Sequence, residues 1–199
     1  MKIESLVVGS YGTNCYILID EGSLQCAVID PGGDALQIIK ALDDSKCKVK
    51  YILLTHGHID HTGAVAEIKN KYNAPIAISE KDYKMMQQGA FVYGNIGNDA
   101  PIYIEDNQVF EIGDIKLKAV YTPGHTPGGV SFITDKVIFS GDTLFQSSIG
   151  RTDFPGGDFE TIIDSIKTKI MVLPDETVVL SGHGPQTFVG EEKMHNPFL

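Results

Sequence analysis

The sequence predicts an αββα sandwich, an α/β fold in which two mixed β-sheets pack face to face and helices cover the outer faces. The predicted elements follow the order β meander, helices, β meander, helix, as this fold requires. With 199 residues, 42% of them hydrophobic, the chain can bury one large core. Because no Pro-rich, low-complexity or single-charge stretch marks a linker, we expect residues 1–199 to form one domain.

The first half of the chain alternates strand and helix patterns. Glu21-Gly22-Ser23 predicts a turn between two β-rich runs, and Asp30-Pro31-Gly32-Gly33 ends the second of them. Apolar residues at helical spacing follow this turn. Ser79, three residues before Asp82, predicts the start of a later helix. We expect strands at 2–8, 14–20, 25–30, 49–54 and 76–78, and helices at 34–43, 62–72 and 79–88.

The second half begins with a glycine-rich, irregular segment at 89–106, which we interpret as a candidate flap. After it, Gly113-Asp114 and Thr134-Asp135 separate runs with strand patterns. We expect strands at 107–112, 115–121, 129–134, 136–140 and 176–180, and a helix near 158–170.

Composition excludes several classes of partner. The formal net charge is −10, and the only arginine is Arg151, so we expect no nucleic-acid partner, which would need clustered positive charge. The start of the chain does not resemble a secretory signal, and no apolar run is long enough for a membrane span. Three cysteines without a CxxC motif are typical of buried, reduced thiols. We therefore expect a cytoplasmic protein that acts on a small molecule.

The run Thr55-His56-Gly57-His58-Ile59-Asp60-His61 directly follows an apolar stretch at 51–54. Imidazole and carboxylate are ligands that zinc and neighbouring metals prefer. A single histidine is more often an ordinary polar group, but similar strand-to-loop junctions carry further candidates downstream. The chain therefore predicts a metal site assembled from distant segments, with seven candidate ligands: His56, His58, Asp60, His61, His125, Asp142 and His183.

These motifs resemble the metallo-β-lactamase superfamily across nearly the whole chain. Ser140-Gly141-Asp142-Thr143-Leu144-Phe145 and Gly150-Arg151-Thr152-Asp153-Phe154 are more specifically similar to glyoxalase II-like hydrolases, including short bacterial forms without the extra C-terminal helical domain. The resemblance implies two divalent metal ions: zinc, with iron or manganese as alternatives. His56, His58 and His125 would hold one ion, Asp60, His61 and His183 the other, and Asp142 would bridge them.

For such a site the resemblance implies hydrolysis of thioesters such as S-lactoylglutathione by a metal-bridging hydroxide, with Asp60 and Asp142 as catalytic residues. A thiolate leaves without a strong general acid, and the motifs contain no obvious one. The alternative is a persulfide dioxygenase, which resembles this chain in the same motifs and uses one iron, held by His56, His125 and Asp142. Metallo-β-lactamases proper usually lack the bridging aspartate.

Several other residues have two interpretations. Asp30 either stabilises its turn or supports the metal ligands. Arg151 either forms a salt bridge with Asp153 or Asp158, or binds a substrate carboxylate, as a basic residue at the matching place does in glyoxalase II-like enzymes. We expect His195 at the surface. Three tyrosines are candidates for a pocket wall or for ordinary packing: Tyr11, Tyr93 and Tyr103.

Overall fold

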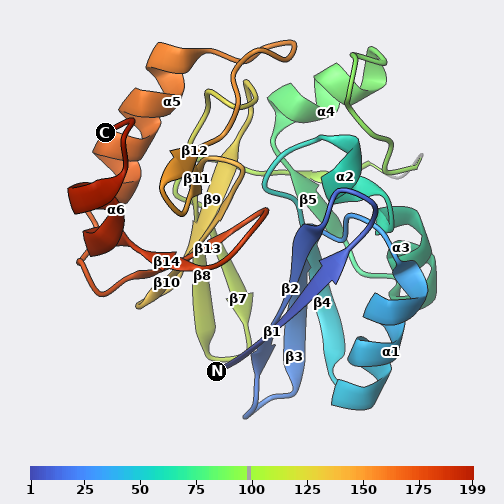
Figure 1. Cartoon of the computed structure of the whole chain (residues 1–199). Coiled ribbons are helices and arrows are strands. Elements are labelled where there is room, and N and C mark those ends of the chain that lie inside the picture. Colours follow the sequence, from blue (N-terminus) through green and yellow to red (C-terminus); the bar gives the residue numbers. More distant parts are fainter. Residues whose placement is uncertain (98–99) are drawn as a thin grey trace.

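The computed structural model describes residues 1–97 and 100–199 and has the predicted αββα architecture (Figure 1). Two mixed sheets form the centre, with α1, α3 and α4 outside one sheet and α5 and α6 outside the other (Figure 1). The predicted fold class is therefore confirmed.

The first sheet has the strand order β1-β2-β3-β4-β5-β6. The pairs β1–β2 and β2–β3 are antiparallel, and the remaining three pairs are parallel. Its strands are β1 (Lys2–Val8), β2 (Thr13–Asp20), β3 (Gln25–Ile29), β4 (Lys48–Leu53), β5 (Ile76–Ile78) and β6 (Ile102–Tyr103). The helices in this half are α1 (Ala35–Ser45), α2 (Ile59–Thr62), α3 (Val65–Tyr72) and α4 (Glu80–Gln87).

The second sheet has the order β14-β13-β10-β9-β8-β7, in which only the pair β10–β13 is parallel among the described strands. Its strands are β7 (Val109–Ile112), β8 (Ile115–Tyr121), β9 (Val130–Ile133), β10 (Val137–Gly141), β13 (Val178–Ser181) and β14 (Thr187–Phe188). A separate hairpin consists of β11 (Leu144–Phe145) and β12 (Ser148–Ile149). The helical segments are α5 (Phe159–Ser165), the π-helical turn η1 (Ile166–Ile170) and α6 (Val189–His195).

The core has three layers because each sheet is covered on both faces. In β2, alternate side chains point to opposite faces: Ile17 and Ile19 pack in the cluster beneath α1 and α3, and Tyr16 and Leu18 pack between the sheets. A third cluster lies between the second sheet and the helical segments α5, η1 and α6. The sandwich therefore holds the strand ends, and the loops that leave them, in fixed positions.

The local predictions fail mainly at short elements. The helix predicted at 62–72 is two helices, α2 and α3, with Gly63 and Ala64 between them. Gly63 packs closely on the loop of Gly32, because a Cβ at position 63 would lie 2.4 Å from the carbonyl oxygen of Gly32. The first helix, α2, begins earlier than predicted. The strand β6 lies within the segment 89–106, which was predicted as irregular. Two positions of that segment, 98–99, lie outside the described residues. The hairpin β11–β12, β14 and α6 were not predicted either.

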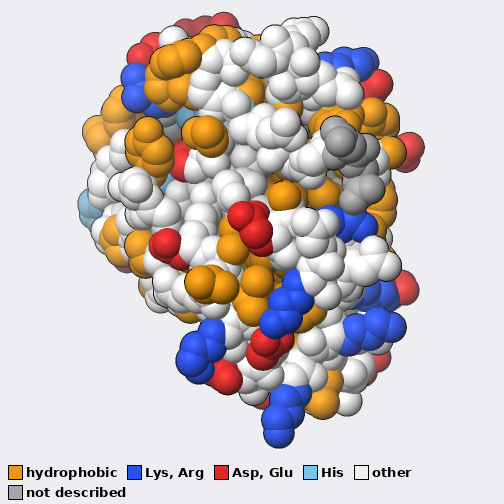
Figure 2. Space-filling view, turned by 90° about the vertical axis from the view of Figure 1, so that its right-hand side faces the viewer, with side chains coloured by type: hydrophobic (Ala, Val, Ile, Leu, Met, Phe, Trp, Pro, Cys, Tyr) orange, Lys and Arg blue, Asp and Glu red, His pale blue; other side chains and the backbone are white. Residues whose placement is uncertain are grey.

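The outer helical layer of the first sheet carries mixed charge. The side of the molecule with α1, α3 and α4 faces the viewer in Figure 2, where lysines and acidic side chains are interspersed. Lys71 on α3 pairs with Asp43 on α1 at 2.6 Å, and Lys84 pairs with Glu80 within α4 at 2.9 Å. None of the described helices is long and apolar enough to cross a bilayer.

Candidate metal centre

The seven predicted ligand side chains converge in loops that follow strands of both sheets. Four segments supply them, following β4, β8, β10 and β13. Because β10 and β13 run parallel, their carboxyl ends meet at the same edge of the second sheet, and the end of β4 lies opposite in the first sheet. The fold therefore brings together residues that are more than 120 positions apart, such as Asp60 and His183 at 3.2 Å.

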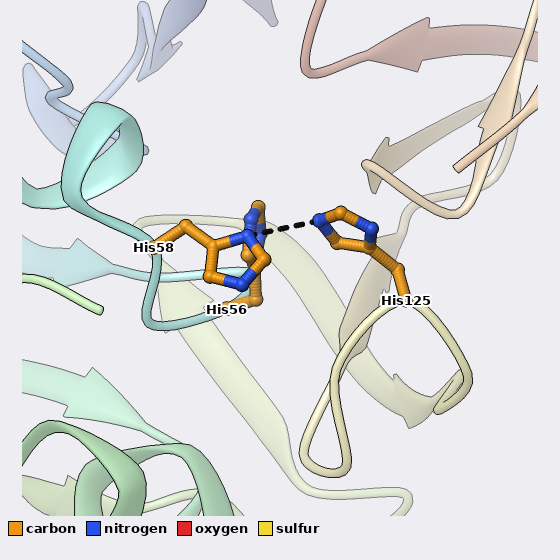
Figure 3. Close-up of side chains that lie close together, drawn as sticks. All are labelled: His56, His58 and His125. Carbon is orange, nitrogen blue, oxygen red and sulfur yellow. Dashed lines mark hydrogen bonds between the residues drawn. The ribbon is translucent and has the colours of Figure 1, made fainter. Parts of the chain in front are cut away.

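One group of ligand atoms comes from His56, His58 and His125, and all three atoms lie within 4.8 Å of one another. The imidazoles approach from two loops and point toward a common centre (Figure 3). His125 Nε2 and His58 Nδ1 are 3.0 Å apart. We call these three residues the first triad.

A second group consists of Asp60, His61 and His183, whose ligand atoms also lie within 4.8 Å of one another. Asp60 and His61 are adjacent on the single turn of α2, and His183 reaches them from the loop after β13. His183 Nε2 is 3.2 Å from Asp60 Oδ2, and His61 Nε2 is 3.7 Å from the same oxygen. We call these residues the second triad.

Asp142 lies between the two triads. Its Oδ1 is 3.3 Å from His61 Nε2, and its Oδ2 is 3.6 Å from both His125 Nε2 and His183 Nε2. The neighbouring Gly182 leaves room for this carboxylate, because a Cβ there would lie 2.1 Å from Asp142 Oδ1. Thus one carboxylate touches members of both triads.

The unpaired polar atoms of this cluster fit a bound metal. Buried polar atoms normally have hydrogen-bond partners, and leaving one without a partner is costly. Four buried atoms of the cluster make no hydrogen bond to the described residues, although two of them, His61 Nε2 and Asp142 Oδ1, face each other at 3.3 Å: His56 Nε2, His58 Nε2, His61 Nε2 and Asp142 Oδ1. Metal ions bind such lone pairs, so the donor set is that of a divalent metal centre rich in nitrogen and oxygen.

The outward nitrogens of three histidines are held by neighbouring oxygens. His125 Nδ1 donates to the backbone carbonyl of Arg151 at 2.7 Å, which leaves Nε2 with a free lone pair. His61 Nδ1 lies 3.0 Å from Asp30 Oδ2, and His56 Nδ1 lies 3.1 Å from Thr55 Oγ1. Each ring is thus oriented with its other nitrogen toward the centre.

Asp30 contacts both Thr55, which lies beside His56, and His61. It is buried and has a left-handed backbone with φ of 50°. Its carboxylate accepts hydrogen bonds from Thr55 N at 2.8 Å and Thr55 Oγ1 at 2.6 Å, in addition to its contact with His61. Of the two interpretations of Asp30, the one in which it supports a candidate ligand is therefore realised. Sequence reasoning missed Thr55, although its position directly before the first histidine was a usable signal.

The electrostatic environments of the two triads differ. Burial and the nearby imidazoles hold the pKa of His56 well below its usual range and lower that of His58 to about 3. Burial also opposes protonation of His61, but Asp142 and Asp30 outweigh it and raise its pKa. For His183, burial is outweighed by Asp60 and Asp142, so its pKa is raised as well. In the metal-free protein, protonation is therefore favoured at His61 and His183 and opposed at His56 and His58.

A cavity of about 650 Å³ opens above the cluster. Its floor contains His58, Asp60, His125, Asp142 and His183, and its walls are mostly apolar. The apolar wall residues, which the sequence reasoning missed apart from Tyr11, are Tyr11, Ile59, Phe91, Val92, Phe145, Ile149 and Phe154. Such a combination of convergent polar groups and apolar walls is typical of small-molecule sites.

Arg151 lies on the rim of this cavity. Its guanidinium forms two hydrogen bonds with Asp153, at 2.6 and 2.7 Å, and stacks over the ring of Phe154 at 3.9 Å. The predicted salt bridge with Asp153 is therefore present, and Asp158 instead caps α5 by accepting from Thr161 N. The Arg151 side chain remains 56% exposed, so a ligand in the cavity can reach it.

The remaining predicted residues divide between the cavity and the core. Tyr11 lines the cavity and Tyr93 packs edge-on against His58, with ring centroids 4.9 Å apart. Tyr103 stacks near Tyr83 and does not line the cavity. His195 is exposed and lies 3.4 Å from Glu191. The cysteines, all within the described residues, are buried and unpaired, as expected: Cys15, Cys26 and Cys47.

Comparisons with known proteins agree with this geometry. The sequence pattern of the Metallo-beta-lactamase superfamily matches residues 8–183. The hydroxyacylglutathione hydrolase GloC of Haemophilus influenzae is 38% identical, over 100% of this chain and 98% of the relative. The crystal structure of BLEG-1 B3 metallo-beta-lactamase has a TM-score of 0.89 and 36% identity, covering 100% of this chain and 99% of its own. TTHA1623 in a di-iron-bound form has a TM-score of 0.88 and 30% identity, covering 98% and 100%.

These similarities confirm the predicted superfamily and its likeness to short glyoxalase II-like hydrolases, and they identify a metallo-hydrolase as the functional class. The histidine and aspartate cluster is a metal-binding arrangement, and a close structural neighbour binds metal. The chain belongs to the metallo-β-lactamase superfamily.

Proposed function

We propose that this metallo-hydrolase cleaves thioesters of the hydroxyacylglutathione type, such as S-lactoylglutathione, with two divalent metal ions. His56, His58 and His125 would hold one ion, and Asp60, His61 and His183 the other. Asp142 would ligate both. Imidazole and carboxylate ligands favour zinc and also accept iron or manganese.

The observation that carries the proposal is the position of Asp142. Its two oxygens lie within 3.3 to 3.6 Å of nitrogens from both triads. A site for one ion would use one triad and leave the other without a role, although each triad has at least one buried nitrogen that makes no hydrogen bond to the described residues. The GloC relative, whose name specifies hydroxyacylglutathione hydrolysis, supports the thioester substrate.

When bound, two divalent ions supply Lewis-acid polarisation of a carbonyl oxygen and acidification of a water molecule. The protein supplies the rest. Asp60 and Asp142 are the carboxylates on the cavity floor and remain ionised: burial opposes this, but neighbouring histidines lower the pKa of both. A departing thiolate is a good leaving group near neutral pH, so no separate strong acid is required.

The cavity walls match a thioester with an apolar linker and an anionic end. Phe91, Phe145 and Phe154 exclude water from the reacting carbonyl, and Arg151 is the cation at the rim. Because the chain has a net charge of −10, this local cation would attract a substrate carboxylate that the rest of the surface repels. Arg151 is therefore the proposed substrate-binding residue.

Metal analysis combined with a thioester assay tests the proposal. We expect the protein purified without chelators to contain two ions per chain and to hydrolyse S-lactoylglutathione. Asp142→Ala should lower both metal content and turnover, since it removes a ligand shared by both ions. Full activity with one iron per chain, together with oxygen consumption when the enzyme is given a persulfide substrate, would instead identify the dioxygenase alternative.

A further inference from the structure

A buried carboxylate outside the ligand set connects the two loops of the first triad. Asp82, in the first turn of α4, is fully buried. Its Oδ2 accepts a hydrogen bond from Gly57 N at 2.9 Å, and its Oδ1 accepts one from Gly128 N at 2.7 Å. Gly57 lies between His56 and His58, and Gly128 follows His125 by three residues. The same side chain thus binds the backbone between His56 and His58 and the backbone of the His125 loop.

The two loops belong to different sheets. The loop with Gly57 leaves β4 of the first sheet, and the loop with Gly128 joins β8 to β9 of the second. A backbone hydrogen bond from Val130 N to Thr55 O, at 2.8 Å, joins the same two segments near their strands. Asp82 adds a second connection between the same loops, through Gly57 and Gly128, so two points rather than one fix their relative position.

The local sequence is adapted to this connection. A Cβ at position 128 would lie 2.6 Å from Asp82 Oδ1 and 2.0 Å from Ser79 Oγ, so glycine is required for the close approach. Ser79 Oγ in turn accepts from Asp82 N at 3.3 Å, which fixes the start of α4. An unpaired buried carboxylate would be costly, and here two backbone donors satisfy one oxygen each.

We propose that Asp82 is a positioning residue that sets the distance between the His56–His58 loop and the His125 loop, and thereby the metal affinity of the first triad. The proposal rests on the proposed function only in that the first triad binds a metal ion. It does not depend on which substrate is hydrolysed. Residues that orient metal ligands from outside typically change affinity 10- to 100-fold when they are replaced.

Asp82→Asn is the sharpest variant, because an amide of the same shape accepts through one oxygen only and must release one of the two loops. The control is Asp20→Asn, in which a buried carboxylate that accepts from Ser23 N and Oγ is changed in the same way. Asp20 is at the far end of β2 from Thr13, which bridges to His183. At about 3.3 Å per residue, this is roughly 20 Å from the site.

The measurement is titration of the metal-free proteins with Co²⁺, followed by visible absorption, alongside urea unfolding. We expect Asp82→Asn to weaken one binding step roughly 10- to 100-fold and to alter the Co²⁺ spectrum. Asp20→Asn should leave the Co²⁺ affinity and the Co²⁺ spectrum unchanged, even where it lowers the unfolding free energy as much as Asp82→Asn does. Wild-type Co²⁺ binding by Asp82→Asn, or an equal loss in both variants, would overturn the proposal. Absence of thioester hydrolysis by the wild-type protein would overturn the proposed function instead.

Hydrogen exchange provides a second test that needs no variant. In the zinc-loaded wild-type protein, the amides of Gly57 and Gly128 should exchange slowly, because both are bonded to a buried carboxylate. In Asp82→Asn, at least one of them should exchange faster. If Asp82→Asn does not fold, the wild-type rates decide: exchange of both amides as fast as in exposed loops would refute the positioning role.

Discussion

Replacement of Asp30 by Asn should weaken metal binding without disturbing the backbone. Asn tolerates the left-handed conformation that Asp30 adopts, with φ of 50°, and has nearly the same shape. However, the carboxylate faces three donors: Thr55 N, Thr55 Oγ1 and His61 Nδ1, at 2.8, 2.6 and 3.0 Å. The amide nitrogen of Asn cannot accept, so one buried donor loses its partner.

The expected size follows from these contacts. An unsatisfied buried donor costs about 1–3 kcal/mol, and loss of charge from the other two bonds adds roughly 1 kcal/mol. We therefore expect Asp30→Asn to lower the unfolding free energy of the metal-free protein by about 2–4 kcal/mol in urea. Because His61 also loses its orienting partner, metal affinity at the second triad should fall roughly 10- to 100-fold.

Asp34→Asn is the matched control for this change. Asp34 has the same left-handed backbone, with φ of 48°, and its carboxylate accepts from Gly9 N at 2.8 Å on the surface. Metal content after dialysis against a competing chelator should fall to about one ion per chain in Asp30→Asn and stay at two in Asp34→Asn. Two tightly held ions in Asp30→Asn would refute the argument that Asp30 orients His61.

Three further predictions concern pH and the substrate. The pKa values of His61 and His183 are raised, so a metal must displace protons from the second triad, whereas His58, with a pKa of about 3, is already neutral. We therefore expect the second triad to lose its ion first as the pH falls from 8 to 5.5. Metal analysis should show two ions per chain becoming one before the last is lost. Arg151→Ala should raise KM for an anionic thioester roughly tenfold and leave that for a neutral thioester unchanged, because only the anion needs the cation. Asp153→Asn frees Arg151 from its ion pair, so KM for the anionic thioester should fall by up to about fivefold; an unchanged KM in both variants would assign the pair to the structure of the loop.

The long elements were predictable because their periodicity records burial. Strand β2 is apolar on both faces since both are covered. The helical spacing of apolar residues predicted α1, although it did not identify the whole buried face: Ile38 and Leu42 are buried, and Leu36 is exposed. The short elements were not predictable in this way. The strands β11 and β12 have two residues each, too few to show a period, and α6 buries only Val189 and Glu192 of its seven residues.

The candidate ligands were predictable because imidazoles and carboxylates gather at strand ends. Their supports were harder to find. Asp82 has the sequence signature of a helix start, which it also is, and nothing local indicates that its carboxylate reaches Gly57 and Gly128. The carbonyl of Arg151 that orients His125 belongs to the backbone and has no residue-type signal. Contacts of this kind depend on tertiary packing alone.

The fold separates the residues that can hold a metal from most of the residues that line the cavity wall. The relative named as a hydroxyacylglutathione hydrolase and the structure named as a B3 metallo-beta-lactamase are 38% and 36% identical to this chain, nearly the same value. The ligands sit on rigid strand ends, but the cavity wall is built by side chains from separate loops, such as Tyr11, Phe91 and Phe154. Because loop side chains can change without moving the strands, this arrangement allows substrate preference to change while the ligand geometry is kept. Exchanging wall residues should therefore alter KM among substrates and leave the metal content at its wild-type value.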